Sequence, residues 1–281
     1  MTKHVEGYFP GAGIGQIYWQ GWLPAADADA VGVVVIVHGA AEHSGRYAHV
    51  GSRLATEGYA SYAFDIRGHG RSEGVRANIN RMSEVVADLD QTIRQAAVRH
   101  EGASVYLLGH SMGGLAALDY VTSPDTSFDL RGLILSGPAV QTELGSKAQR
   151  VLGRALSAVL PNFGVLKIDA TAVSRDPAVV SAYDTDPLNY RGKLRLRTGA
   201  ETLVAADRVQ ARLSTVELPI LVMHGTKDRL TSPAGSQLVA DRAGSSDITL
   251  KLYDGLYHEV FNEPEQDSVL DDVVQWLRAH G

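Results

Sequence analysis

One serine of the chain stands in a pattern that predicts acyl transfer. Ser111 lies in Gly109-x-Ser111-x-Gly113, between an apolar run with strand character and a Leu/Ala-rich segment with helical propensity. A strand, a sharp turn and a helix in this order are typical of a nucleophile elbow, which raises the serine hydroxyl above the sheet edge in a strained backbone conformation. The two glycines are consistent with a nucleophile elbow, because a Cβ at either position would collide with the neighbouring backbone. The alternative interpretation is an ordinary serine in a glycine-rich turn.

A serine nucleophile needs a base for its proton and a carboxylate that orients the base. Asp228 follows a buried apolar run that starts at Pro219, and His258 lies in the loop after the next predicted strand, 248–253. Both positions fall on the sheet edge where Ser111 is expected, in the chain order Ser, Asp, His. The sequence therefore predicts Ser111, Asp228 and His258 as the catalytic residues.

Three other residues could compete for these roles and are less well placed. His224 is expected in strand-end packing, and His280 stands beside the last residue of the chain. Asp254 lies too close in sequence to His258 and follows the wrong strand.

An oxyanion needs two backbone N–H donors. Met112 begins the helix after Ser111, so its N–H points at an oxyanion formed there. The second donor is assigned to Ala40, which follows the β-branched run 31–37 and a His-Gly pair. His38 is expected to brace this loop through hydrogen bonds. A metal site at His38 and His43 is disfavoured, because no third ligand is spaced nearby.

The elements that must position these residues alternate along the chain. Strands are predicted over 5–9, 16–22, 31–37, 59–64, 104–108 and 131–138, from 219, and over 248–253, and helices over 47–57, 82–100, after Ser111, over 232–242 and over 264–279. Such alternation predicts an α/β fold with a mostly parallel central sheet flanked by helices. The first two strands form a hairpin through the glycine-rich turn 11–15. The charged stretch 65–72 is expected to be a structural network that orients loops, with a catalytic role as the less favoured alternative.

The alternation stops between 141 and 216, where the sequence is helical and irregular. We expect residues 1–140 and 217–281 to form the core and 141–216 an inserted cap over the active site. A helix over 148–160 carries more apolar residues than one buried face requires: Val151, Leu152, Ala155, Leu156, Val159 and Leu160. Either this helix packs between cap and core, or it belongs to a lid that touches lipid.

Composition excludes several classes of function. The 281 residues carry a net charge of −6 with no long basic block, so no nucleic-acid partner is expected. The chain has no cysteine, which excludes disulfides, a thiolate nucleophile and cysteine metal sites. No run reaches 18 apolar residues and no classical signal peptide is visible, so we expect a cytoplasmic protein, with peripheral membrane association left open.

Four motifs together resemble the monoacylglycerol lipases of the α/β-hydrolase fold. They are the stretches 38–47, 65–72, 109–114 and 257–259. Within the expected cap, Ser174-Arg175-Asp176-Pro177 and the stretch 183–188 look like bacterial, especially mycobacterial, members. Ala41 departs from the family pattern, which usually has glycine at this position.

The resemblance implies cleavage of monoacylglycerol to a fatty acid and glycerol, without cofactor or metal. It also implies that Glu42, Arg46 and Tyr183 lie near the glycerol, with Ala40 and Met112 supplying the oxyanion N–H groups. A second interpretation is that Glu42 and Arg46 only pair with each other and hold the loop.

Other functions share this machinery or this fold. A lysophospholipase or a general carboxylesterase would use the same three catalytic residues, and only comparison of substrates separates them. Haloalkane dehalogenases and epoxide hydrolases are disfavoured, because their nucleophile is an aspartate where this chain has Ser111. A catalytically inactive binding protein with this fold would be expected to lack a triad residue, and none is missing.

Overall fold

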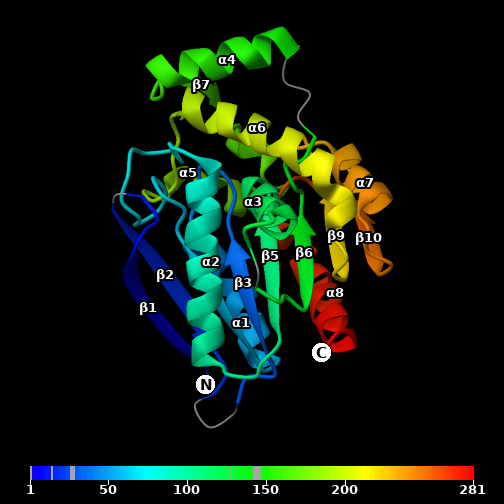
Figure 1. Ribbon diagram of the computed structural model, residues 1–281. Helices are drawn as coiled ribbons and strands as arrows, with labels where there is room; N and C mark the ends of the chain where they lie inside the picture. The colour runs from blue at the N-terminus through cyan, green and yellow to red at the C-terminus, as the bar shows by residue number, and fades with distance from the viewer. Residues whose placement is uncertain (1, 14, 26–28, 127, 142–146) are drawn as a thin grey trace.

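The computed structural model describes residues 2–13, 15–25, 29–126, 128–141 and 147–281, without the side chains of 147–152. Its centre is an eight-stranded sheet in the order β1-β2-β4-β3-β5-β6-β9-β10 (Figure 1). The strands are β1 (Lys3–Pro10), β2 (Gln16–Leu23), β3 (Gly32–Val37), β4 (Tyr59–Phe64), β5 (Val105–His110), β6 (Gly132–Ser136), β9 (Ile220–Gly225) and β10 (Ile248–Tyr253). The β1–β2 hairpin and the β2–β4 pair are antiparallel, and all other neighbouring strands are parallel. The prediction of a mostly parallel sheet is confirmed.

Strand β3 shows why the sheet needs helices on both faces. All six of its residues are buried. Val33, Val35 and Val37 belong to the core on one face, and Val34 and Ile36 to the core on the other. A strand that is apolar on both faces is stable only between two layers of helices.

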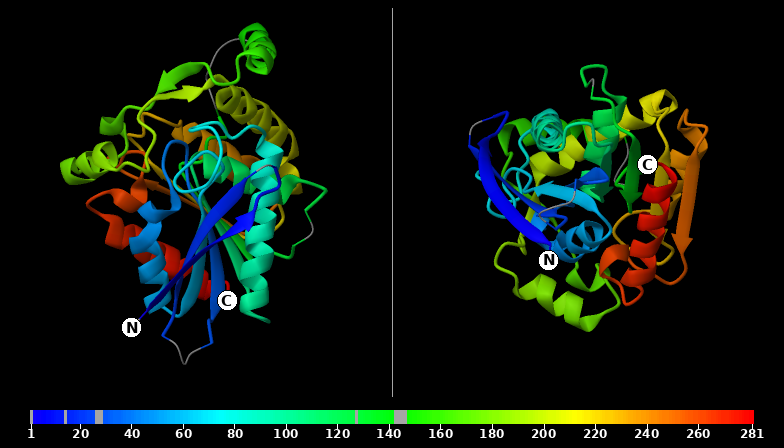
Figure 2. Two further views of the ribbon diagram at one scale, coloured as in Figure 1. Left: turned by 90° about the vertical axis from the view of Figure 1, so that its left-hand side faces the viewer. Right: turned by 90° about the horizontal axis from the view of Figure 1, so that it is seen from below.

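Five helices of the described residues supply those layers: α1 (Ala48–Thr56), α2 (Met82–Arg99), α3 (Met112–Thr122), α7 (Pro233–Arg242) and α8 (Gln266–Ala279). Helices α2, α3 and α7 add side chains to one core, and α1 and α8 to the other. The left view of Figure 2 shows α1 in blue and α8 in red across the sheet from α2 in cyan. Helices α1, α2 and α8 each bury one apolar stripe against the sheet, as their sequence period predicts, whereas α3 is buried on nearly every side.

The chain between β6 and β9 lies above the carboxyl ends of the parallel strands (Figure 1). It contains α4 (Lys147–Val159), β7 (Gly164–Lys167), α5 (Pro177–Thr185), β8 (Lys193–Arg195) and α6 (Leu196–Arg212). β7 and β8 pair in an antiparallel two-stranded sheet. The expectation of only helical and irregular structure here is therefore wrong. Strands of four and three residues whose partners lie far apart in sequence carry no readable alternation.

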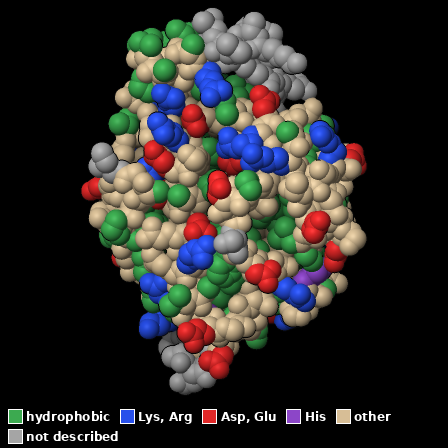
Figure 3. All heavy atoms as spheres, viewed as in Figure 1, with side chains coloured by type: hydrophobic (Ala, Val, Ile, Leu, Met, Phe, Trp, Pro, Cys, Tyr) green, Lys and Arg blue, Asp and Glu red, His purple; other side chains and the backbone are tan. Residues whose placement is uncertain are grey.

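The described end of α4 exposes its apolar side chains. Leu156, Val159 and Leu160 are 44, 77 and 51% exposed, and Phe163 beyond the helix is 61% exposed. Figure 3 shows hydrophobic side chains gathered at this end of the molecule. The side chains of Val151 and Leu152 lie outside the described residues. The exposed positions disfavour the interpretation of α4 as a helix packed between cap and core. None of the described helices has the length and apolar character to span a bilayer.

Candidate active site

The turn between β5 and α3 has the geometry of a nucleophile elbow. Ser111 has φ 55° and ψ −118°, a region that costs a non-glycine residue about 1–3 kcal/mol. Its N–H donates to the Ser136 carbonyl at the end of β6, at 2.9 Å. A Cβ on Gly109 would lie 2.6 Å from the Gly113 carbonyl oxygen, and one on Gly113 would lie 2.2 Å from that of Val37. Both glycines are therefore required for the close approach of helix and strands, as the sequence predicts.

Asp228 and His258 meet at the same edge of the sheet. Asp228 lies in the turn after β9 and His258 in the loop after β10, and His258 Nδ1 is 2.7 Å from Asp228 Oδ2. Both side chains are buried. Burial lowers the pKa of His258, but the charge and hydrogen bond of Asp228 outweigh it, so the pKa lies above its usual value. Burial raises the pKa of Asp228, yet His258, His224 and further donors bring it well below its ordinary range.

Of the three residues that the sequence disfavoured as base or acid, two lie away from the Asp228–His258 pair and one contacts it. Asp254 accepts a hydrogen bond from Thr226 at the surface, and His280 stacks on Trp276 near the chain end. His224, assigned to strand-end packing, instead places Nε2 at 2.9 Å from Asp228 Oδ2. The sequence signal was its position four residues before Asp228, but only the fold of the intervening turn brings the two side chains together.

One cavity of about 690 Å³ gathers most of the sequence-predicted site residues. These lining residues are Ala40, Glu42, Ser111, Met112, Tyr183, Asp228 and His258. The chain between β6 and β9 adds apolar wall, including Val165, Leu166, Leu194 and Leu203. Val165 and Leu166 are also exposed, so the apolar wall continues onto the outer surface. The cavity thus joins a serine on an elbow, an Asp–His pair and a path suited to an alkyl chain.

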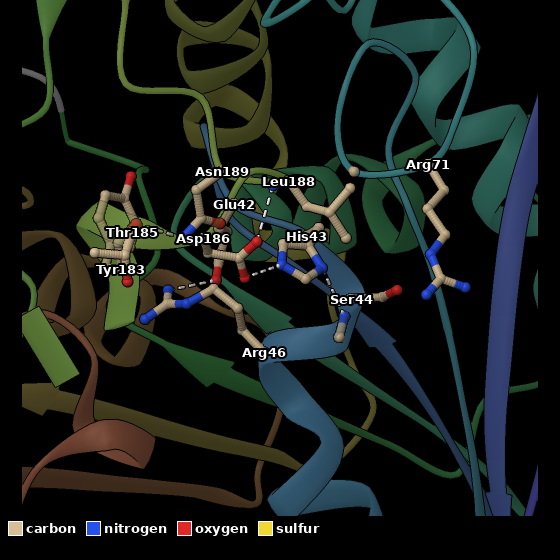
Figure 4. A network of polar contacts seen from close by, with 12 residues as sticks. Glu42, His43, Ser44, Arg46, Arg71, Tyr183, Thr185, Asp186, Leu188 and Asn189 are labelled. Atoms are coloured by element: carbon tan, nitrogen blue, oxygen red, sulfur yellow. Dashed lines mark hydrogen bonds and ion pairs between the residues drawn. The ribbon is translucent and has the colours of Figure 1, made fainter. Parts of the chain in front are cut away.

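Arg46 is not among the lining residues but contacts three of them, Glu42, Tyr183 and Glu259. It pairs with Glu42 at 2.9 Å, makes two contacts with Glu259 at 2.5 and 2.7 Å, and stacks over the Tyr183 ring at 4.8 Å. Figure 4 shows Arg46 between Glu42 and Tyr183. Burial raises the pKa of Glu42, against the charge of Arg46. Burial also raises the pKa of Glu259, but the charge and hydrogen bonds of Arg46 outweigh burial, so the pKa of Glu259 lies below its usual value.

Glu42 and Tyr183 differ in how much of their hydrogen-bonding capacity the protein uses. Glu42 Oε1 accepts from the Gly39 N–H at 2.5 Å and from the Tyr47 hydroxyl at 2.9 Å. Glu42 also pairs with Arg46, so the loop-holding ion pair of the second interpretation from the sequence is present. The Tyr183 hydroxyl is buried and has no hydrogen-bond partner among the described residues. An unpaired buried hydroxyl is costly, which makes it a natural contact for a polar ligand.

The loop that follows β3, residues 38–47, for which the sequence predicts an oxyanion donor at Ala40, is held by its own histidine. His38 Nδ1 lies 2.7 Å from the Gly39 carbonyl, and its Nε2 accepts from the Ile66 N–H at 2.8 Å. The ring is therefore neutral with the proton on Nδ1, in agreement with burial, which lowers its pKa well below the ordinary value. The expectation that His38 braces the loop is confirmed.

The loop is also tied to the chain between β6 and β9. Ala41 has φ 65°, so the loop makes a left-handed turn at this residue despite its Cβ. Its carbonyl accepts from the Tyr190 N–H at 2.8 Å, and His43 Nε2 lies 2.9 Å from Asp186 Oδ2. Figure 4 shows His43 pointing to Asp186. These contacts couple the position of the oxyanion loop to the segment above it.

The charged stretch 65–72 forms the expected structural network. Asp65 Oδ1 accepts from the N–H and hydroxyl of Ser44 at 2.8 and 2.6 Å, and Oδ2 accepts from the Arg71 N–H at 2.7 Å. Arg67 pairs with Asp88 at 2.7 Å. Among the residues that the structure describes, no cluster of three or more His, Asp or Glu could hold a metal ion.

Comparison with known proteins places the chain in a family. The model described as serine aminopeptidase, S33 matches residues 28–265. Monoacylglycerol lipase of Mycolicibacterium smegmatis is 43% identical over 280 residues, 99% of each chain. Human monoglyceride lipase is 34% identical over 260 residues, 91% of this chain and 84% of that protein. The crystal structure of Paleococcus ferrophilus monoacylglycerol lipase is 28% identical, covers 99% of this chain and 100% of its own, and has a TM-score of 0.81. The chain belongs to the monoacylglycerol lipase family of α/β-hydrolases.

Proposed function

We propose that this protein hydrolyses monoacylglycerol to a fatty acid and glycerol. The observation that carries the proposal is a single cavity in which Ser111, held at a positive φ, shares the walls with a buried Asp228–His258 pair and with apolar side chains. The names of the relatives in Mycolicibacterium smegmatis and human point to the same substrate.

The proposed reaction proceeds through an acyl-enzyme. Ser111 Oγ attacks the ester carbonyl while His258 Nε2 takes its proton, and Asp228 holds the imidazole through Nδ1. The Ala40 and Met112 N–H groups receive the oxyanion. The C–O bond to glycerol then breaks as His258 returns the proton to the leaving oxygen. Water, deprotonated by His258, attacks the acyl-enzyme. The bond from the acyl carbon to Ser111 Oγ then breaks as His258 passes the proton to Oγ, which releases the fatty acid and restores Ser111.

We assign the glycerol end to Tyr183 and Glu42, supported from behind by Arg46. Both side chains line the cavity, and the Tyr183 hydroxyl lacks a partner among the described residues. A site with an unpaired buried hydroxyl favours a substrate that brings a hydroxyl to it over one that does not. Arg46 neutralises Glu42 and Glu259 and stacks on Tyr183, so its role is to hold this end in place.

Residues 141–216 form the proposed cap, and its outer surface is the proposed contact with lipid. Leu156, Val159, Leu160 and Phe163 are exposed there, and the apolar wall of the cavity reaches the surface at Leu166. A patch of this kind lowers the cost of lifting an acyl chain out of a lipid aggregate.

A panel of substrates tests the proposal against its alternatives. Mono-, di- and triacylglycerols, a lysophospholipid and a p-nitrophenyl ester, all with one acyl chain, are compared by kcat/KM. The proposal expects monoacylglycerol to be the best natural substrate. A higher value for the lysophospholipid would reassign the protein as a lysophospholipase, and equal values for all accessible esters would indicate a general carboxylesterase.

A further inference from the structure

A second histidine, His224, contacts the same Asp228 oxygen as His258. His258 Nδ1 and His224 Nε2 lie 2.7 and 2.9 Å from Oδ2, and the Thr231 hydroxyl lies at 2.8 Å. Oδ1 accepts from two backbone N–H groups, those of Leu230 and Thr231, at 2.7 and 3.0 Å. The His224 and Asp228 side chains are fully buried. Thr231 also lies 3.1 Å from the Gly137 carbonyl and has one proton to give, so His224 is the firmer second donor.

The partners of the two ring nitrogens of His224 determine where its proton lies. Nδ1 is 2.7 Å from the hydroxyl of Ser236, a buried residue of α7. An ionised Asp228 can only accept, so His224 must carry its proton on Nε2, and Nδ1 then accepts the Ser236 hydroxyl proton. Ser236, His224, Asp228 and His258 thus form one hydrogen-bonded chain in which Ser236 donates to His224 and both histidines donate to Asp228.

We infer that His224 is a positioning residue for catalysis, which holds the Asp228 carboxylate in place and shares its negative charge with His258. The inference rests on the proposed function, in which Asp228 orients His258. A hydrogen bond donated to a carboxylate stabilises its charged form. It also draws charge from the oxygen that faces His258, so the imidazolium of His258 is less strongly stabilised than beside a carboxylate without this donor. His224 therefore keeps Asp228 ionised and limits how far it raises the proton affinity of the base.

Other groups act on the same base and stay in place in the test. His110 of β5 has its ring centroid 4.6 Å from that of His258, and Glu259 follows it in the chain. Glu42 raises the pKa of His258 through its charge, and Arg46 lies between the two glutamates. Among the described residues, no hydrogen bond or ion pair joins these groups to His224. Asp228 and Thr231 contact both histidines, the Thr231 hydroxyl at 3.4 Å from His224 Nε2 and 3.2 Å from His258 Nδ1, and Thr231 is unchanged in the test.

The test measures kcat/KM against pH for a soluble ester with His224→Phe, which keeps a ring and removes the donor. We expect kcat/KM at the optimum to fall about 10- to 100-fold, the range seen when partners that orient a ligating histidine are removed. We also expect the acidic limb to move to higher pH by roughly half a unit or more, because Asp228 then stabilises the His258 imidazolium more strongly. His224→Gln retains an N–H donor at a similar reach, so its limb should stay near that of the wild type.

Two further variants keep the test decisive. Ser236→Ala removes the hydroxyl that donates to His224 Nδ1, which weakens the hold on the ring, and should shift the limb in the same direction by less, even if His224→Phe does not fold. His100→Phe, at the far end of α2, is the matched control and should shift nothing. Unshifted limbs for both His224→Phe and Ser236→Ala, or an equal shift for His224→Gln, would overturn the inference. Asp228→Asn distinguishes failure of this inference from failure of the proposed function, because near-normal activity of that variant would overturn the proposed triad.

Discussion

Tyr183 and Glu42 line the same cavity, but their chemical situations differ. The carboxylate of Glu42 accepts from Gly39 and Tyr47 and pairs with Arg46, so most of its acceptor capacity serves the oxyanion loop. The Tyr183 hydroxyl is buried without a partner among the described residues. Recognition of glycerol should therefore depend more on Tyr183, and loop geometry more on Glu42.

Tyr183→Phe separates these roles. The variant should raise KM for monoacylglycerol about 5- to 20-fold, equal to one hydrogen bond of about 1–1.8 kcal/mol, with little change in kcat. The p-nitrophenyl ester of the same acyl chain has no glycerol, so its KM should not change. Glu42→Gln should instead lower kcat/KM on both substrates. Equal losses on both substrates for Tyr183→Phe would show that it supports the site without contacting glycerol.

The pH dependence of the wild type follows from His258. As the base it must be neutral to accept the Ser111 proton, and its pKa lies above the usual 6.5 because Asp228 outweighs burial. Activity should therefore be full above this pKa and fall as pH decreases through it. A profile of kcat/KM for a soluble ester should show an acidic half-point above 6.5. A half-point clearly below 6.5 would contradict the assigned environment of His258.

At the scale of elements, the core was predictable and parts of the upper segment were not. Strands β4 and β10 have the predicted bounds, Tyr59–Phe64 and Ile248–Tyr253, because β4 is a largely apolar run and β10 alternates apolar and polar residues. The β7–β8 pair and the start of α6 at Leu196 depend on contacts within the segment, so the local pattern around 191–197 did not reveal them. The role of His224 was missed for the same reason, since it depends on how the turn after β9 folds back. The site residues themselves were predictable from motif spacing, and their catalytic roles stay predictions.

The exposed end of α4 gives a prediction about lipid. Replacing Leu156, Val159 and Leu160 by serine should lower kcat/KM on dispersed monoacylglycerol about tenfold, because roughly 60 Å² of apolar contact at about 25 cal/mol per Å² amounts to about 1.5 kcal/mol. Activity on a short soluble ester and the Tm should change little, since these side chains are exposed. Val98→Ser, at an exposed apolar position of α2, is the matched control and should leave both activities unchanged. Equal losses on both substrates with a lower Tm would indicate that the three residues pack in the protein.

At the scale of the whole molecule, the parallel strands of the sheet bring the candidate site residues together. Ser111, Asp228 and His258 follow β5, β9 and β10, which are parallel, so their carboxyl ends meet at one edge. The chain between β6 and β9 lies over that edge and is tied to the oxyanion loop through His43–Asp186 (Figure 4). Residues more than a hundred positions apart therefore act as one unit only in the complete fold.

The most direct test of the central claim is labelling with a fluorophosphonate, followed by mass spectrometry of the modified peptide and by measurement of monoacylglycerol hydrolysis. We expect a single adduct on Ser111, and we expect Ser111→Ala to lose both the adduct and hydrolysis, by about 10⁴-fold or more, with an unchanged Tm. An adduct on another serine, or hydrolysis retained by a folded Ser111→Ala variant, would contradict the assignment of Ser111 as the nucleophile.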